Sequence, residues 1–268
     1  MSRHERSVAI KILVSELGQE HPEASLLRRL ASGPVDHPGR NNMPELFDLF
    51  ELHGPNGVHQ CLVMELLGQS MASLAEGFAT YRLPEDVALQ VSNQVIQAIA
   101  YVHRMGIVHG GLFTRLFFPS NLLMPCALDL HPGNIVLADR TISKRPAGEI
   151  IQLMGAPVTA EVRGTALGRY MPQYLVLPST LPLSPELSNN CKVKIIDFGS
   201  ALLSGDPSPK MRFPLPFRAP EAVITGSWDV EADIWSLGCT VREQPFSNSQ
   251  YMADISSDLR PDRRLSAI

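Results

Sequence analysis

The chain has 268 residues, a length that allows one or two domains. Its formal net charge is −4, with 44% hydrophobic and 19% charged residues, so the sequence gives no basic surface for nucleic acid. Its 4 cysteines lie far apart without a C-x-x-C pair, so we expect reduced thiols and no zinc site. No apolar run could span a membrane and no signal-peptide core is visible, so we expect the cytoplasm or the nucleus.

The first part of the sequence predicts a small α+β unit. Ser7 to Val14 is a β-branched apolar run with one lysine, which is typical of a buried strand. Residues 22–30 open with Pro and Glu and predict a short helix. Residues 46–52 and 59–66 are apolar runs that flank the turn sequence GPNG, which predicts a hairpin.

The remainder predicts a mainly helical unit. A long helix begins near Leu83, and its apolar residues recur at helical spacing on one face: Val87, Val91, Val95, Ala98 and Val102. Two short strands follow, NIVLA (134–138) and VKII (193–196). Residues 140–190 are punctuated by Pro and Gly and contain one plausible helix, EIIQLMG, so we interpret them as a long loop insert.

Four short motifs follow one another along the chain. They are VAIK (8–11), DLHPGN (129–134), DFG (197–199) and APE (219–221). Each motif alone is a weak signal. In this order, with the first on a strand, the third at a strand end and a long amphipathic helix before the second, they resemble the eukaryotic protein kinases.

More narrowly, the sequence is similar to the divergent, fungal-type SR-protein kinases. The similarity lies in LGQSM, DLHPGN, IIDFGSA, PLPFRAPE and WDVEADIWSLGC. It implies an α+β, two-lobed kinase fold with a small β-rich N-lobe (1–67) and a mainly helical C-lobe (68–268). It also implies a serine/threonine protein kinase that uses ATP and Mg²⁺ and acts on protein substrates, including Arg/Ser-rich splicing factors.

The resemblance assigns the chemistry to four side chains. Phosphoryl transfer depends on positioning and charge neutralisation more than on covalent chemistry. Lys11 would pair with the α- and β-phosphates, and Asp129 would accept or orient the proton of the substrate hydroxyl. Asn134 and Asp197 carry the oxygen atoms that Mg²⁺ prefers and would hold the metal.

The same resemblance assigns the hinge of the nucleotide site. Met64 corresponds to the gatekeeper, and the backbones of Glu65 and Leu67 would contact adenine.

Glu23 is the expected helix partner of Lys11. Because few residues separate Lys11 from Glu23 and the helix is short, Glu20 and Glu16 remain alternatives. Leu27 would lie one turn after Glu23 on the same helical face.

Several positions depart from the kinase pattern. Gly110 replaces the arginine that receives an activation-loop phosphate, so we expect phosphorylation of Ser204 or Ser208 to be unnecessary. His131 replaces the usual lysine of the catalytic loop.

Two residues near these motifs have structural interpretations. Asp233 is expected to brace the backbone of the catalytic loop, as the corresponding residue does in the kinase family. His109 is expected to be a packed core residue and not a base.

Three features suggest an interrupted kinase. Joining His109-Gly110 directly to Asp129 gives the continuous loop HGDLHPGN, so we interpret 111–128 as a retained in-frame intron or a gene-model error. Only ten residues precede Lys11, so we expect that the Gly-rich loop is missing. Few residues separate DIWSLGC from LRPDRRLSAI, which contains Arg264, the expected partner of Glu221. We therefore expect an exposed apolar face near Trp235 and Leu237.

Two other functions are open. The HG…DLHPGN pattern also resembles the small-molecule phosphotransferases that act on aminoglycosides and choline, although these lack the APE and DIWSLGC segments. A catalytically inactive, binding-only kinase fragment is the third interpretation. In each case we expect a monomer that binds neither nucleic acid nor membrane.

Overall fold

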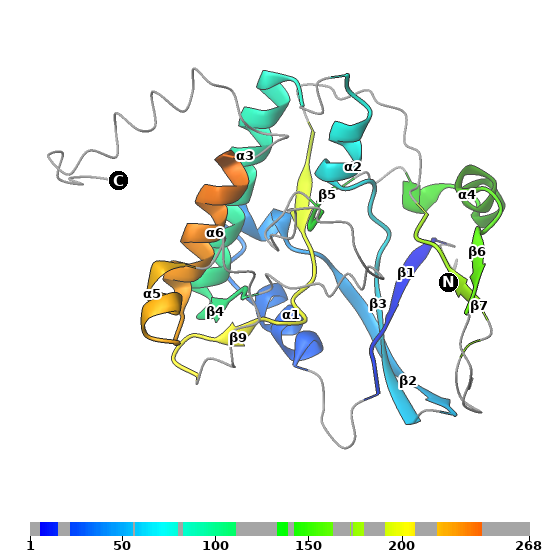
Figure 1. Cartoon of the computed structure of the whole chain (residues 1–268), viewed down its shortest axis with the longest axis horizontal. Helices are drawn as coiled ribbons and strands as arrows, with labels where there is room; N and C mark the ends of the chain where they lie inside the picture. Colours follow the sequence, from blue (N-terminus) through cyan, green and yellow to red (C-terminus); the bar gives the residue numbers. More distant parts are fainter. Residues whose placement is uncertain are drawn as a thin grey trace, which may run out of the picture.

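A computed structural model of the chain describes residues 6–15, 22–55, 57–79, 83–110, 133–138, 142–162, 172, 174–179, 191–206 and 219–242. Figure 1 shows a twisted sheet beside a helical part, as expected for the predicted α+β fold. Within these residues no helix is both long enough and apolar enough to cross a bilayer.

The sheet contains β1 (Val8–Ile12), β2 (Leu46–Gly54) and β3 (Gly57–Glu65). All pairings are antiparallel, and β3 lies in the centre with β1 and β2 at the edges. The predicted hairpin is therefore confirmed, with Gly57 at its turn at a φ of +125° that favours glycine. The predicted first strand is confirmed between Val8 and Ile12, but its predicted burial is wrong, because Val8, Ile10 and Ile12 are exposed on this edge strand.

Helix α1 (Glu23–Ala31) connects β1 to β2 and follows the predicted bounds within one residue. Acidic Glu23 in its first turn and two arginines in its last turn complement the helix dipole. Its C-terminal end is tied to the helical part by two hydrogen bonds: the Tyr101 hydroxyl donates to the Leu30 carbonyl, and Arg29 Nε donates to the Met105 carbonyl at 2.7 Å.

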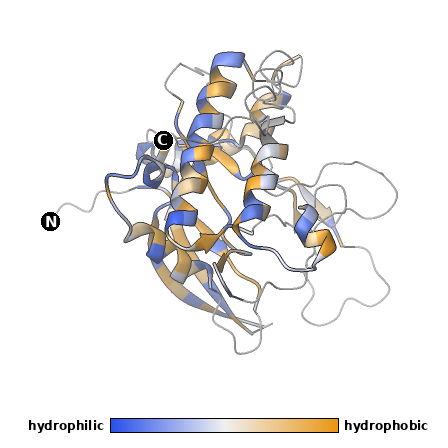
Figure 2. Cartoon of the chain, turned by 90° about the vertical axis from the view of Figure 1, so that its left-hand side faces the viewer, coloured by the Kyte–Doolittle hydropathy of each residue, from blue (hydrophilic) through white to orange (hydrophobic). Residues whose placement is uncertain are grey.

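The segment that returns from α1 to the sheet includes the 3-10 helix η1 (Pro38–Asn42). η1 packs against the long helix α3 (Glu85–Arg104). The apolar face predicted for α3 is confirmed, because all five of its residues are buried: Val87, Val91, Val95, Ala98 and Val102. Figure 2 shows apolar and polar residues alternating along the helices, as expected when each has one buried face.

Three more helices belong to the helical part: α2 (Met71–Glu76), α5 (Pro220–Ile224) and α6 (Val230–Arg242). α6 packs against α3. On its outer side, Trp235 is 43% exposed, as predicted, whereas Leu237 is partly buried against the core, so the exposed face is smaller there than expected.

Two short strand pairs pack against the helices of this part. β4 (Ile107–Val108) pairs with β9 (Leu202–Leu203), and β5 (Ile135–Leu137) pairs with β8 (Val193–Ile195). The second pair corresponds to the predicted strands NIVLA and VKII. Its two strands bring the residue before β5 and the residues after β8 to the same end of the ladder.

The insert has more regular structure than the predicted long loop. It contains the 3-10 helix η2 (Ile142–Lys144), the predicted helix α4 (Ala147–Met154), and an unpredicted hairpin of β6 (Thr159–Glu161) with β7 (Tyr174–Val176). These strands are too short to show an alternation in the sequence, and their pairing partners lie far apart along the chain.

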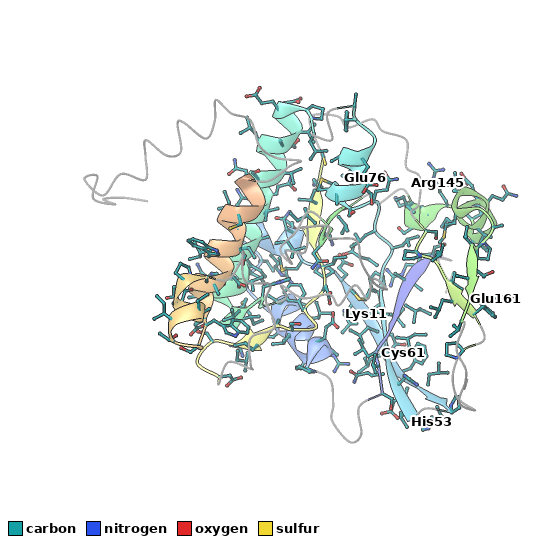
Figure 3. All side chains as sticks on the ribbon, viewed as in Figure 1. Lys11, His53, Cys61, Glu76, Arg145 and Glu161 are labelled. Atoms are coloured by element: carbon teal, nitrogen blue, oxygen red, sulfur yellow. The ribbon has the colours of Figure 1, made fainter. Side chains whose placement is uncertain are left out.

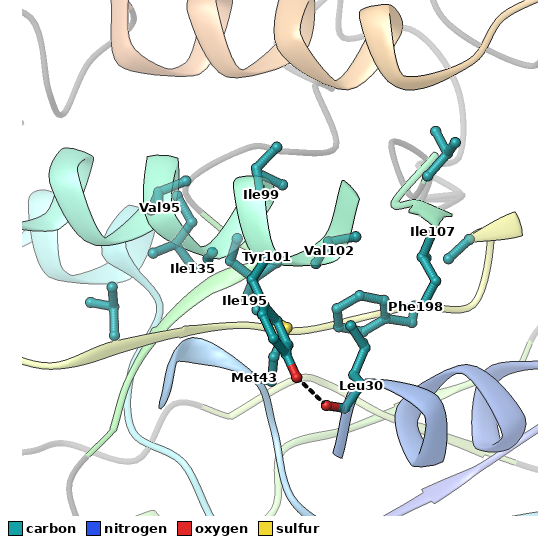
Figure 4. Packing of buried hydrophobic residues seen from close by; sticks show 14 of the residues in the cluster. Leu30, Met43, Val95, Ile99, Tyr101, Val102, Ile107, Ile135, Ile195 and Phe198 are labelled. Atoms are coloured by element: carbon teal, nitrogen blue, oxygen red, sulfur yellow. Dashed lines mark hydrogen bonds between the residues drawn. The ribbon is translucent and has the colours of Figure 1, made fainter. Parts of the chain in front are cut away.

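The core runs along α3 and continues under α1 and β8. Figure 4 shows Tyr101 of α3 bonded to Leu30 of α1, with Phe198 close to both. Phe198 and Tyr101 are fully buried, and they belong to one cluster that spans both parts of the molecule. Among the described residues, Cys61, Cys191 and Cys239 form no disulfide, in agreement with the expected reduced thiols.

Candidate functional site

Lys11 joins two acids where the sheet faces the helical part (Figure 3). Its Nζ lies 2.7 Å from Glu23 Oε1 on α1 and 2.7 Å from Asp197 Oδ1 after β8. Lys11 projects from an edge strand, where its neighbours in the ladder are Leu62 and the β-branched residues of β1. Three elements that are distant in sequence therefore contribute one charged cluster.

The charges within this cluster stabilise one another. Burial acts to lower the pKa of Lys11, but attraction to Glu23 and Asp197 outweighs it and raises this pKa above its ordinary value. Burial acts to raise the pKa of Asp197, but Lys11 outweighs it and holds this pKa below its usual range. Lys11 is thus cationic and Asp197 anionic at neutral pH. Glu23, whose side chain is only 1% exposed, lies at the inner end of the cluster.

Asn134 and Asp197 are neighbours because of the β5–β8 ladder. Asn134 precedes β5 and is buried, and its carbonyl accepts a hydrogen bond from the Ile196 amide at 2.9 Å. Asp197 follows Ile196 directly and has a φ of +69°, in the left-handed region that is uncommon for non-glycine residues and recurs at functional sites.

The donor set at this end of the ladder fits Mg²⁺. A carboxylate and a carboxamide supply hard oxygen atoms, and Mg²⁺ is commonly held by one or two protein groups together with substrate phosphates. Across the described ranges, no group of three His, Cys, Asp or Glu side chains is placed to hold a metal by itself. A metal at this position would need ligands beyond Asn134 and Asp197.

The motif that contains Asp197 is fixed by packing. The Phe198 ring meets the His109 ring edge to face, with centroids 4.7 Å apart. His109 is fully buried, and burial lowers the pKa of its imidazole, so the ring is neutral at pH 7. The prediction that His109 is a packed core residue is confirmed.

Asp233 of α6 binds the backbone that leads into the catalytic loop. Its carboxylate accepts the amide of His109 at 2.7 Å and the amide of Gly110 at 3.0 Å, and His103 Nε2 lies 2.9 Å from Oδ2. Asp233 therefore braces the backbone of His109 and Gly110, whereas most of the catalytic loop that it was predicted to brace, residues 129–132, lies outside the described residues. The contribution of His103 was not predicted, because its partner is far away in sequence.

The predicted hinge residues lie at and beyond the end of β3. Met64 pairs with Ala9 of β1, and Glu65 pairs with Val8. Leu67 lines a cavity of about 270 Å³ beside the hinge, together with residues of β2, β8 and η2. The hinge and the strand that carries Lys11 are therefore adjacent.

Glu65 has a partner that the sequence did not indicate. Its side chain forms an ion pair with Lys194 of β8, which is 5% exposed. A lysine in a short apolar strand gives no signal about which acid it will meet, and only the packing of β8 beside the hinge reveals it.

Other sequence-predicted positions lie outside the described residues. These are Glu16, Glu20, residues 111–128, Asp129, His131, Ser208 and Arg264. Of the three glutamates weighed for Lys11, Glu23 is bonded to it. Glu221 is described, and its Oε1 atom is buried without a hydrogen-bond partner among the described residues.

Comparison with known proteins gives a consistent set of relatives. No family model matches the chain. Protein kinase dsk1 of Schizosaccharomyces pombe is 33% identical over 126 residues, which cover 44% of this chain and 22% of dsk1. Serine/threonine-protein kinase SRPK of Physarum polycephalum is 26% identical, covering 89% of this chain and 54% of that protein.

A plant relative extends over nearly the whole chain. Serine/threonine-protein kinase AFC1 of Arabidopsis thaliana is 23% identical over 97% of this chain and 48% of its own length. The chain thus spans between about one fifth and about half of the length of these curated relatives.

Among solved structures, a crystal structure of a kinase domain matches with a TM-score of 0.53 and 22% identity. The match covers 89% of this chain and 56% of that one.

Proposed function

We propose that this chain, which has the fold of a protein-kinase domain and resembles SR-type and dual-specificity protein kinases in sequence, is an ATP- and Mg²⁺-dependent serine/threonine protein kinase. The division into an N-lobe (1–67) and a C-lobe (68–268) is part of this proposal, as is the assignment of the hinge to Met64, Glu65 and Leu67.

One observation carries the proposal: Lys11 Nζ lies 2.7 Å from both Glu23 and Asp197. The ion pair with Glu23 holds the lysine in an extended position, where it can meet the α- and β-phosphates of a nucleotide. Asp197 is then in place for a metal on those phosphates, with Asn134 beside it across the ladder. One acidic partner would be enough for a lysine that only stabilised an edge strand. Lys11 has two, and the second is the aspartate with the positive φ.

The chemistry follows from this arrangement. The oxygen of a substrate hydroxyl attacks the γ-phosphorus, the bond from that phosphorus to the bridging oxygen of ADP breaks, and the hydroxyl proton leaves to a base, for which Asp129 is the candidate. Mg²⁺, when bound, neutralises charge on the phosphates. Lys11 orients the phosphates, and Asp197 and Asn134 hold the metal.

The substrate class is the finer part of the proposal. One relative, from Physarum polycephalum, is named serine/threonine-protein kinase SRPK, which supports Arg/Ser-rich protein segments as substrates. Such a segment would approach the helical part, where the APE residues (219–221) begin α5.

The decisive experiment combines binding with transfer. Thermal unfolding of the chain would be measured with and without Mg-ATP, and transfer of the γ-phosphate would be followed to an Arg/Ser peptide and to the same peptide with alanine in place of serine. We expect stabilisation by Mg-ATP and labelling of the serine peptide only. Lys11→Met should abolish both effects, whereas the exposed Lys192→Met should abolish neither.

The other outcomes separate the alternatives. Stabilisation without transfer would identify a binding-only kinase fragment. Transfer to choline or an aminoglycoside, and not to the peptide, would identify a small-molecule phosphotransferase. A chain that neither binds nor transfers would contradict the proposal.

A further inference from the structure

The ion pair between Lys194 and Glu65 connects the hinge to β8, the strand that precedes the proposed metal ligand Asp197. Lys194 Nζ donates to Glu65 Oε1, and the two side chains are 7% and 16% exposed. The same oxygen of Glu65 accepts the backbone amide of Glu45 at 2.8 Å. Glu65 thus accepts one hydrogen bond from a charged donor, the Lys194 ammonium, and one from a neutral donor, the Glu45 amide.

The pair is difficult to explain as a contribution to stability alone. Removing two charges from water is so unfavourable that a buried ion pair often gives no more stability than two apolar residues of the same volume. Such pairs, however, tolerate few geometries, because moving either partner leaves a buried charge. The pair therefore fixes the position of the segments that carry it.

Those segments border the nucleotide site of the proposed function. Glu65 is the last residue of β3, and the hinge residues Leu66 and Leu67 follow it directly. Lys194 is the central residue of β8, which reaches Asp197 after only two more residues. The hinge also meets the neighbouring strand, since the Gly68 amide donates to the Leu137 carbonyl at 2.8 Å.

We infer that Lys194 is a positioning residue for nucleotide binding: by holding the Glu65 side chain, it sets the orientation of the hinge backbone that contacts the purine. The inference rests on the proposed function. It assigns Lys194 to the base end of the ligand, while Lys11 and Asp197 serve the phosphate end. The two ends can therefore be tested separately.

The test uses two probes, adenosine and Mg-tripolyphosphate, with binding to the whole chain measured by calorimetry. Lys194→Met should weaken adenosine binding about tenfold, because a shifted hinge misplaces its hydrogen bonds. It should leave tripolyphosphate binding unchanged. Lys194→Arg, which keeps the charge, should recover most of the adenosine affinity. Lys192→Met replaces an exposed lysine two residues earlier and should change neither affinity.

A second variant distinguishes a loss of hinge positioning from a loss of folding. In Glu65→Leu/Lys194→Met both charges are removed, so the chain should regain the stability lost in Lys194→Met. Adenosine binding should stay weak, because the hinge is no longer held. Full adenosine affinity in this folded double variant would overturn the inference and leave the pair a purely structural one.

The remaining outcomes are also distinct. Equal loss of adenosine and tripolyphosphate binding in Lys194→Met would overturn the inference, since it would indicate general disruption of the site. A wild-type chain that binds neither probe would overturn the proposed function, and with it the positioning role. If the wild type binds both probes and Lys194→Met binds adenosine equally well, only the inference fails.

Discussion

The indole ring of Trp228 fills the space into which a side chain on Gly110 would project. A β-carbon on Gly110 would lie 2.7 Å from Cζ3 of Trp228 and 3.1 Å from the Ser200 carbonyl oxygen, and Gly110 has a φ of +50°. The glycine that replaces the usual phosphate-binding arginine is thus required by the packing around it. A receptor for an activation-loop phosphate cannot be restored there by substitution.

Replacing Gly110 should therefore destabilise the fold. Gly110→Arg adds a steric clash to a left-handed backbone, and we expect the free energy of unfolding to fall by about 2–4 kcal/mol. Denaturant unfolding measures this loss. Gly155→Arg is the matched control, because Gly155 has a φ of +73° with nothing within 4 Å of its β-carbon position. An equal loss in both variants would assign the effect to the backbone and contradict the role of Trp228.

Ser204 should be dispensable for phosphate transfer. Its hydroxyl donates to both carboxylate oxygens of Asp229, at 3.1 and 3.3 Å, so a phosphate attached there would face an acid. We expect Ser204→Ala to transfer phosphate within about twofold of the wild type, since an exposed hydrogen bond contributes little. Initial rates on an Arg/Ser peptide test this expectation. A strict need for a phosphorylated Ser204 would contradict it.

Asp233→Asn should weaken the connection between α6 and the loop before the catalytic segment. The carboxylate accepts two buried backbone amides, whereas an amide side chain offers one acceptor oxygen and a misplaced donor. We expect a loss of about 2–4 kcal/mol in unfolding free energy. Glu231→Gln, on an exposed position of the same helix, should lose less than about 0.5 kcal/mol. Similar losses in both would show that helix charge, and not this bond set, matters.

His109 should make the fold sensitive to acid. Burial lowers the pKa of its imidazole, so the unfolded chain binds a proton below the ordinary value of 6.5 while the folded chain does not. The unfolded state binds more protons there, so stability falls as pH decreases from about 6.5, by no more than about 2 kcal/mol at pH 5. His109→Phe keeps an aromatic ring against Phe198 and should remove this part of the pH dependence. Unfolding at pH 7 and pH 5 compares the two chains, and identical slopes would contradict the assignment.

The sequence predicted those parts of the site that depend on motif order. Lys11 lies in a β-branched run and Asp197 ends another, and local patterning alone indicates strands in both places. The bracing by Asp233 could also be anticipated from its motif. In each case the residue type, its element and its neighbours agree, which makes such predictions reliable.

The parts that were missed depend on tertiary packing. The Lys194–Glu65 pair requires β8 to lie beside the hinge, and nothing local to Lys194 indicates that acid. Trp228 lies in an irregular segment, so its contact with Gly110 has no periodic signal. The β6–β7 hairpin was interpreted as loop because its strands are only three residues long.

The two bonds that hold the C-terminal end of α1 determine how this helix can move. Because the Leu30 carbonyl and the Arg29 side chain are bonded to Tyr101 and Met105, a tilt of α1 would pivot about its last turn. Glu23 is at the other end of α1, about 10 Å from Leu30 at 1.5 Å per residue. A swing of about 10° would carry it about 2 Å, enough to separate it from Lys11. A small tilt of α1 would therefore be enough to break or form the ion pair between Glu23 and Lys11.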